Sequence, residues 1–89
     1  MIERKIIIIN KLGLHARAAA KLVTLASSFQ SKIELKSKYK TANGKSIMSV
    51  MMLAACQGTE ITLCIDGNDE KQVVAALEML INHRFDESE

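Results

Sequence analysis

The sequence has few aromatic residues and few cysteines, and both shortages exclude classes of function. Aromatic residues make up 3% of the 89 residues and tryptophan is absent, so the stacking surfaces of single-strand and RNA-binding domains are missing. The two cysteines, Cys56 and Cys64, have no other cysteine or histidine at a metal-binding spacing. A disulfide scaffold would contain more cysteines. We therefore expect reduced thiols, a cytoplasmic location, and neither a metal nor a cofactor.

Long apolar runs and a strong excess of charge of either sign are also missing. The four isoleucines at residues 6–9 are too few to cross a bilayer, and they lack the length and the cleavage site of a signal peptide. The net charge is +2, and the five lysines between residues 32 and 45 alternate with other residue types as on a solvated strand face. The sequence thus predicts no membrane anchor and no nucleic-acid partner.

What the sequence does contain is apolar periodicity. Hydrophobic residues make up 48% of the chain, which indicates one compact domain over residues 1–89. β-Branched or alternating segments predict strands, and apolar spacings of three and four predict helices. The expected strands are residues 3–9, 32–36, 39–42 and 60–66, and the expected helices are residues 16–28, residues 47–55 and a last helix that begins after the turn at 66–69.

The predicted order is β-α-β-β-α-β-α, an α+β fold. Strands that alternate apolar and polar residues are typical of an antiparallel sheet with one covered face, against which the helices pack. In residues 60–66 the alternation places Ile61, Leu63 and Ile65 inward. It places Thr62 and Cys64 outward.

The segment Gly13-Leu14-His15-Ala16-Arg17 carries the chemistry. A histidine directly before a helix lies beside free backbone N–H groups at the positive end of the helix dipole. That field predicts a neutral, nucleophilic imidazole at pH 7, and the N–H groups of Ala16 and Arg17 would face a phosphoryl group on the ring. Arg17 could add a planar fork of donors. The simpler alternative is a helix cap at His15 and a solvated charge at Arg17.

Two other polar residues have structural explanations. Ser46 stands where the N-cap of the second helix belongs. Gly44-Lys45-Ser46 is not a nucleotide-binding P-loop, because that motif needs a glycine at position 39, where this chain has Tyr39. His83, in the last turn of the final helix, complements the negative end of that helix.

Two motifs carry a family resemblance. Gly13-Leu14-His15-Ala16-Arg17-Ala18-Ala19 resembles the active-site motif of HPr, the histidine-containing phosphocarrier of the phosphoenolpyruvate-dependent phosphotransferase system. Residues 43–50, Asn-Gly-Lys-Ser-Ile-Met-Ser-Val, resemble the regulatory-serine segment of the same family. The separation of the motifs, the length and the order of elements agree over nearly the whole chain.

The resemblance implies a fold and a role. The fold would be an open-faced β-sandwich, a four-stranded, mainly antiparallel sheet with three helices on one face. His15 would accept a phosphoryl group on Nδ1 from enzyme I and pass it to an enzyme IIA protein, with Arg17 stabilising the group. The protein would be a carrier and not an enzyme. Ser46 would be the substrate of a regulatory serine kinase and phosphorylase.

One residue departs from the family pattern, and one surface is expected to dock partners. Relatives usually have proline where this chain has Ala18, and alanine keeps the helix while restoring one N–H donor. A short helix cannot bury every side, and methionine suits surfaces that fit several partners. The predicted docking patch, placed near His15 by the resemblance, comprises Ala16, Arg17, Ala20, Ile47, Met48 and Met51.

Other functions remain open at this level. A regulatory carrier that signals nitrogen or carbon status without moving sugar would use the same chemistry at His15. A non-phosphorylated module that docks a transcription regulator would not need that residue as a nucleophile. An RNA-binding βαββαβ domain is disfavoured by the scarcity of aromatic residues. We expect a monomer.

Overall fold

The computed structural model describes residues 1–88 and has the predicted order of elements. The strands are β1 (Ile2–Ile7), β2 (Lys32–Lys36), β3 (Thr41–Asn43) and β4 (Glu60–Asp66). The helices are α1 (Ala16–Ser27), α2 (Ile47–Met52), α3 (Glu70–Asn82) and the short 3-10 turn η1 (Arg84–Asp86).

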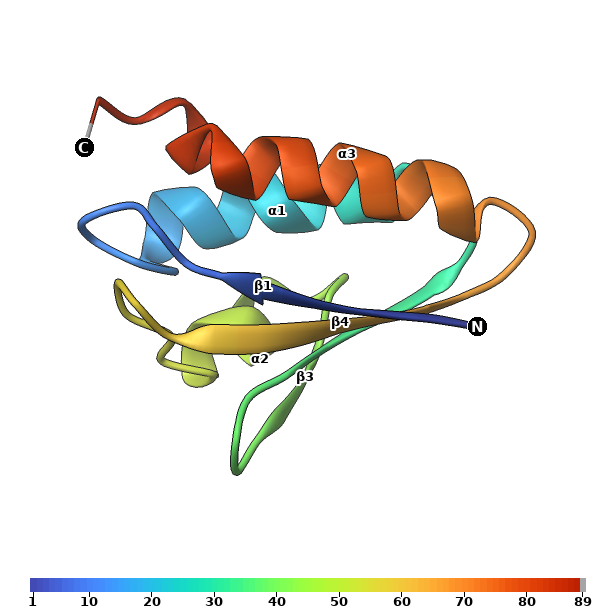
Figure 1. Ribbon diagram of the computed structural model, residues 1–89, viewed down its shortest axis with the longest axis horizontal. Coiled ribbons are helices and arrows are strands. Elements are labelled where there is room, and N and C mark those ends of the chain that lie inside the picture. The colour runs from blue at the N-terminus through green and yellow to red at the C-terminus, as the bar shows by residue number, and fades with distance from the viewer. Residues whose placement is uncertain (89) are drawn as a thin grey trace.

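The four strands form one open antiparallel sheet in the order β1-β4-β2-β3. The helices α1 and α3 lie side by side over one face of the sheet (Figure 1). The short helix α2 packs against α1 and β3. The predicted α+β fold with one covered sheet face is therefore confirmed.

The core lies between the sheet and the two long helices. The isoleucine run could not be oriented from its sequence, and the structure decides it, because Ile6 and Ile8 are buried while Ile7 is half exposed. Ile6 faces Ile61 of β4 across the sheet. The buried stripe of α3 is Val73, Val74, Leu77 and Ile81.

Three predicted elements, two strands and the second helix, are shorter than predicted or shifted along the sequence. The strand expected at residues 3–9 is Ile2–Ile7, because β4 begins at Glu60 and Ile8 instead bonds to the turn residues Gly58 and Thr59. The strand expected at residues 39–42 is Thr41–Asn43. A turn closed by Ser37 N–H and the Lys40 carbonyl, 2.8 Å apart, leaves Tyr39 exposed.

The helix expected at residues 47–55 ends at Met52. The backbone tightens after that residue, since Leu53 N–H bonds the Val50 carbonyl, and Ala54 adopts a left-handed φ of 55°. This reversal ends the helix and turns the chain back toward the sheet.

Cys64 points outward as predicted, but it is not exposed to solvent. Cys64 lies on the sheet face away from the helices, yet only 3% of it is exposed. Glu3 and Glu34 stand opposite it on the two neighbouring strands, and the Glu3 Oε2 atom lies 4.0 Å from its Sγ atom. This burial raises the pKa of the thiol.

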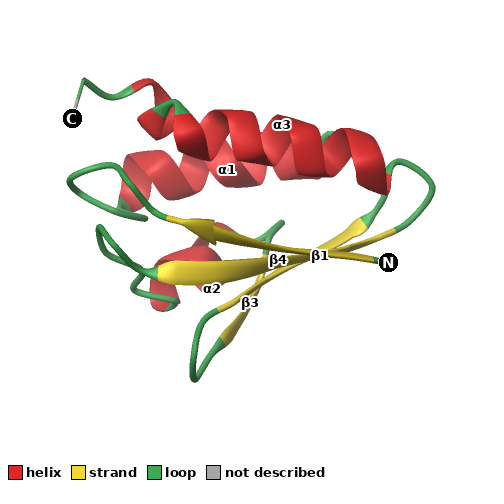
Figure 2. Cartoon of the chain, viewed as in Figure 1, coloured by secondary structure: helices red, strands yellow, loops and turns green. Residues whose placement is uncertain are grey.

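Three loops or chain ends meet at one end of the sandwich. They are the segment between β1 and α1, the segment between α2 and β4, and the C-terminal segment after α3, all at the left in Figure 2. Backbone bonds join the first two, with Leu14 N–H 2.8 Å from the Ala55 carbonyl oxygen. This meeting point carries His15.

Candidate phosphoryl-accepting site

The turn before α1 is built around Gly13. Its φ is +66°, a left-handed value that glycine adopts without steric cost. A Cβ atom at this position would lie 2.4 Å from the Ala55 carbonyl oxygen and 2.7 Å from the Cys56 Cα atom. Glycine is therefore required twice, for the backbone angle and for the close approach of the two loops.

His15 is the N-cap residue of α1, and its ring is free of the capping role. Its backbone is extended, and its carbonyl accepts the first helical hydrogen bond, from Ala19 N–H at 2.8 Å. Its side chain makes no capping hydrogen bond. The alternative that His15 is simply a side-chain cap is thus not supported, and the imidazole remains available, with 27% of the side chain exposed.

The first turn of α1 offers donors beside the ring. The N–H groups of Ala16, Arg17 and Ala18 precede the first helical hydrogen bond, so they have no partner within the helix. Ala18 itself is fully buried. Its N–H is the extra donor expected where relatives usually have proline.

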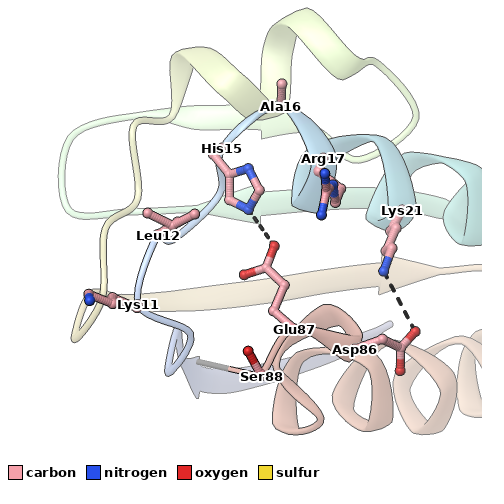
Figure 3. A pocket seen from close by; sticks show the side chains of 9 residues that line it. All are labelled: Lys11, Leu12, His15, Ala16, Arg17, Lys21, Asp86, Glu87 and Ser88. Atoms are coloured by element: carbon pink, nitrogen blue, oxygen red, sulfur yellow. Dashed lines mark hydrogen bonds and ion pairs between the residues drawn. The ribbon is translucent and has the colours of Figure 1, made fainter.

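A shallow depression lies around the histidine (Figure 3). Two cationic side chains of α1, Arg17 and Lys21, contribute to it, and its opposite wall comes from the C-terminal segment. The lining residues are Lys11, Leu12, His15, Ala16, Arg17, Lys21, Asp86, Glu87 and Ser88.

The residue of this depression that bonds to the His15 ring was not predicted from the sequence. Glu87 forms a hydrogen bond with His15 Nε2 through its Oε2 atom, although the two residues are 72 positions apart. Burial raises the pKa of Glu87, but hydrogen bonds from Asn10 and His15 and the charges of His15 and Arg17 outweigh it, so the pKa lies below its ordinary value. The only sequence signal was an acidic C-terminal stretch, which is too common to indicate a site.

Ser46 is confirmed as the N-cap of α2. Its Oγ atom accepts a hydrogen bond from Ser49 N–H at 3.3 Å. Ser49 Oγ in turn accepts from Asn43 N–H at 2.8 Å, which ties the helix to β3. Whether Ser46 is modified stays a prediction.

The predicted docking residues are on the surface of adjoining helices. Ala16 is exposed and Ala20 is partly exposed on α1, and α2 packs against that helix. The exposed fractions of Ile47, Met48 and Met51 are 43%, 68% and 38%. Met52, at 68%, was not predicted.

Two further observations concern metal binding and membrane spans. Among residues 1–88, no three histidine, cysteine or acidic side chains lie together as a metal ion would require. None of the helices in that part of the chain is long and apolar enough to span a membrane.

Comparison with known proteins identifies the family. The family model described as PTS HPr component phosphorylation site matches residues 2–83. The chain belongs to the HPr family. It is 54% identical to the phosphocarrier protein HPr of Xylella fastidiosa over 87 residues, which cover 98% of each chain. Like other HPr proteins, it is a phosphocarrier of the phosphotransferase system and not a catalytic enzyme.

Solved HPr structures have the same fold. The crystal structure of HPr from Thermoanaerobacter tengcongensis superposes with a TM-score of 0.95 at 44% identity and covers all of both chains. Crh of Bacillus subtilis, solved as a domain-swapped dimer, matches with a TM-score of 0.75 at 38% identity over 94% of this chain and 97% of its own. The matches to phosphocarrier proteins do not favour the alternatives of a purely regulatory carrier or a non-phosphorylated binding module.

Proposed function

We propose that this HPr-family chain carries the phosphoryl group on His15, accepting it from enzyme I and passing it to enzyme IIA proteins. The observation that carries the proposal is the imidazole at the N-cap of α1, whose Nδ1 atom has no hydrogen-bond partner among residues 1–88. It lies beside Arg17 and beside three N–H groups that have no partner within the helix. Residues 1–89 act as one phosphocarrier domain, in the cytoplasm and as a monomer.

The transfer is a displacement at phosphorus. The lone pair of His15 Nδ1 forms the new P–N bond while the bond between the phosphoryl group and enzyme I breaks, and that bond's electron pair stays on enzyme I. The N–H groups of Ala16 and Arg17 and the Arg17 guanidinium then face the phosphoryl oxygens. In the second transfer a histidine of enzyme IIA attacks the phosphorus, the P–N bond to His15 breaks, and its electron pair returns to Nδ1.

The test is the intact mass of the protein after incubation with enzyme I and phosphoenolpyruvate. We expect one acid-labile phosphoryl group on the wild type and none on His15→Ala. His83→Ala is the matched control, because His83 is the other histidine of the chain and is exposed. It should be phosphorylated as the wild type is. Phosphoryl gain by His15→Ala would overturn the proposal.

The docking patch proposed for both partners is the surface made by Ala16, Arg17, Ala20, Ile47, Met48 and Met51. Met48→Asp should slow transfer from enzyme I about tenfold, because it places a charge in an apolar contact, while leaving the fold intact. Met79→Asp is the control, since Met79 is 62% exposed on α3. Equal transfer rates for the two variants would exclude the patch.

Ser46 is the proposed site of a regulatory kinase and phosphorylase. A phosphate there would add about two negative charges close to the docking patch. Such charge would oppose the approach of an acidic partner surface.

A further inference from the structure

We propose that Glu87 is a positioning residue for His15, which fixes the proton on Nε2 and leaves Nδ1 as the phosphoryl acceptor. This inference rests on the proposed role of His15. It concerns a residue beyond the match to the family model, which ends at residue 83.

Both oxygens of the Glu87 carboxylate are engaged at the site. Oε2 bonds to His15 Nε2, and Oε1 accepts from Asn10 Nδ2 at 3.0 Å. Asn10 is fully buried and also donates to the Gly13 carbonyl at 2.8 Å. The carboxylate therefore connects the histidine to the same loop that positions it, and only 13% of the Glu87 side chain is exposed.

The backbone before Glu87 has a strained conformation that directs this side chain toward His15. Arg84, Phe85 and Asp86 have φ values of 56°, 54° and 62°, three consecutive non-glycine residues in the left-handed region. Such conformations persist only where surrounding structure enforces them, and they cluster at functional sites. The reversal takes the chain out of α3 and brings Glu87 to the start of α1, where it bonds to His15.

Phe85 and Lys21 hold this reversal in place. Phe85 is fully buried in the core, and Lys21 Nζ of α1 donates to the Phe85 carbonyl at 2.7 Å. Lys21 also pairs with Asp86 at 3.8 Å. Figure 3 shows the result, with the Glu87 side chain extending from the C-terminal segment to the imidazole.

The contact determines which ring nitrogen can react. An ionised carboxylate only accepts hydrogen bonds, so Nε2 must carry the proton. A neutral imidazole protonated on Nε2 has its lone pair on Nδ1. Among residues 1–88, Nδ1 has no hydrogen-bond partner.

The same contact assists the transfer itself. When Nδ1 forms the P–N bond, Nε2 keeps its proton and the ring gains one positive charge. The Glu87 carboxylate, already bonded to that N–H, faces the charge as it develops, as a buried carboxylate does for a catalytic histidine. No proton has to leave the site.

The experiment compares Glu87→Ala, Glu87→Gln and Glu3→Gln in the full chain. Glu3→Gln removes one negative charge from the sheet face away from the helices, so it controls for net charge. Glutamine at 87 has only one oxygen for two donors, so it cannot satisfy both Asn10 and His15. The readouts are the ¹⁵N shifts of the His15 ring, which report the tautomer, and the rate of phosphoryl acceptance from enzyme I.

We expect Glu87→Ala to shift the His15 proton partly to Nδ1 and to slow acceptance about tenfold. Glu87→Gln should show a smaller change in the same direction, and Glu3→Gln none. An unchanged tautomer in Glu87→Ala, or acceptance as fast as or faster than in the wild type, would overturn the inference. The second result would make Glu87 a shield over the histidine. A wild type that accepts no phosphoryl group would instead overturn the proposed function.

Discussion

The first turns of α1 and α2 have the same backbone arrangement, but their N-cap side chains have different roles. His15 and Ser46 are both N-cap residues with extended backbones, and the carbonyl of each accepts the first helical hydrogen bond, at 2.8 and 3.0 Å. Ser46 then uses its side chain to cap the helix. The side chain of His15 is instead held by Glu87 from the far end of the chain.

This difference shows how a helix start becomes reactive. A side chain that caps its own helix satisfies N–H groups and is stabilising. A side chain held away from them leaves those N–H groups for an incoming anion. The cost is that the first N–H groups of α1 lack hydrogen bonds within the helix. The Gly13 turn and the C-terminal segment hold this end of the helix in place.

The largest expected effect is on the turn that presents His15. Gly13→Ala combines a left-handed φ with a Cβ clash against backbone atoms, so it should lower the free energy of unfolding by about 2–5 kcal/mol. Gly58→Ala is the matched control. Its φ is +90°, but nothing lies within 4 Å of its added Cβ, so it should cost about 1–2 kcal/mol. Urea unfolding measures both, and equal losses would show that the close approach is unimportant.

The second effect tests the cation at the α1 site. Arg17→Ala removes charged hydrogen bonds to the phosphoryl oxygens, so it should slow acceptance from enzyme I about tenfold to hundredfold. The fold should be unaffected because Arg17 is exposed. Lys38→Ala, at an exposed position in the turn between β2 and β3, removes the same charge. Stopped-flow transfer rates that match for the two variants would contradict this role.

A smaller effect separates the cap of α2 from the carrier chemistry. Ser46→Ala should lower the free energy of unfolding by about 1 kcal/mol and leave phosphoryl acceptance unchanged. Ser46→Asp keeps an acceptor at the cap, so its stability should stay close to that of the wild type while its added charge slows acceptance. A lower free energy of unfolding for Ser46→Asp than for Ser46→Ala would contradict the capping role of residue 46.

The smallest effect is a pH dependence confined to the α1 site. The pKa of Glu87 is lower in the folded protein than in the unfolded chain, so its stabilising contribution is present above the unfolded pKa and is lost as pH falls through the folded one. Between pH 5 and about pH 2, Glu87→Gln should lose a few tenths of a kcal/mol less unfolding free energy than the wild type, because a contact that solvent still reaches is weakened by screening. Urea midpoints between pH 5 and about pH 2 provide the measurement. An unchanged slope would mean that the pKa of Glu87 is the same in the folded and unfolded chain.

Local sequence patterns predicted most of the fold. The alternation in residues 60–66, the apolar stripe of α3 and the N-cap at Ser46 each depend on neighbours a few positions away, and each was found. Boundaries were less predictable, since the end of β1 depends on where β4 starts, and the burial of Cys64 depends on two neighbouring strands.

The sequence by itself determined the order of the elements, the open antiparallel sheet and the place of His15 at a helix start. It could do so because hydrophobic periodicity, glycine turns and caps act over short distances. Only the tertiary structure decided which isoleucines face the core, why Gly13 tolerates no Cβ, and which group holds the imidazole. Those contacts join residues 42 to 77 positions apart, and a local sequence pattern cannot specify contacts that form only when the chain is packed.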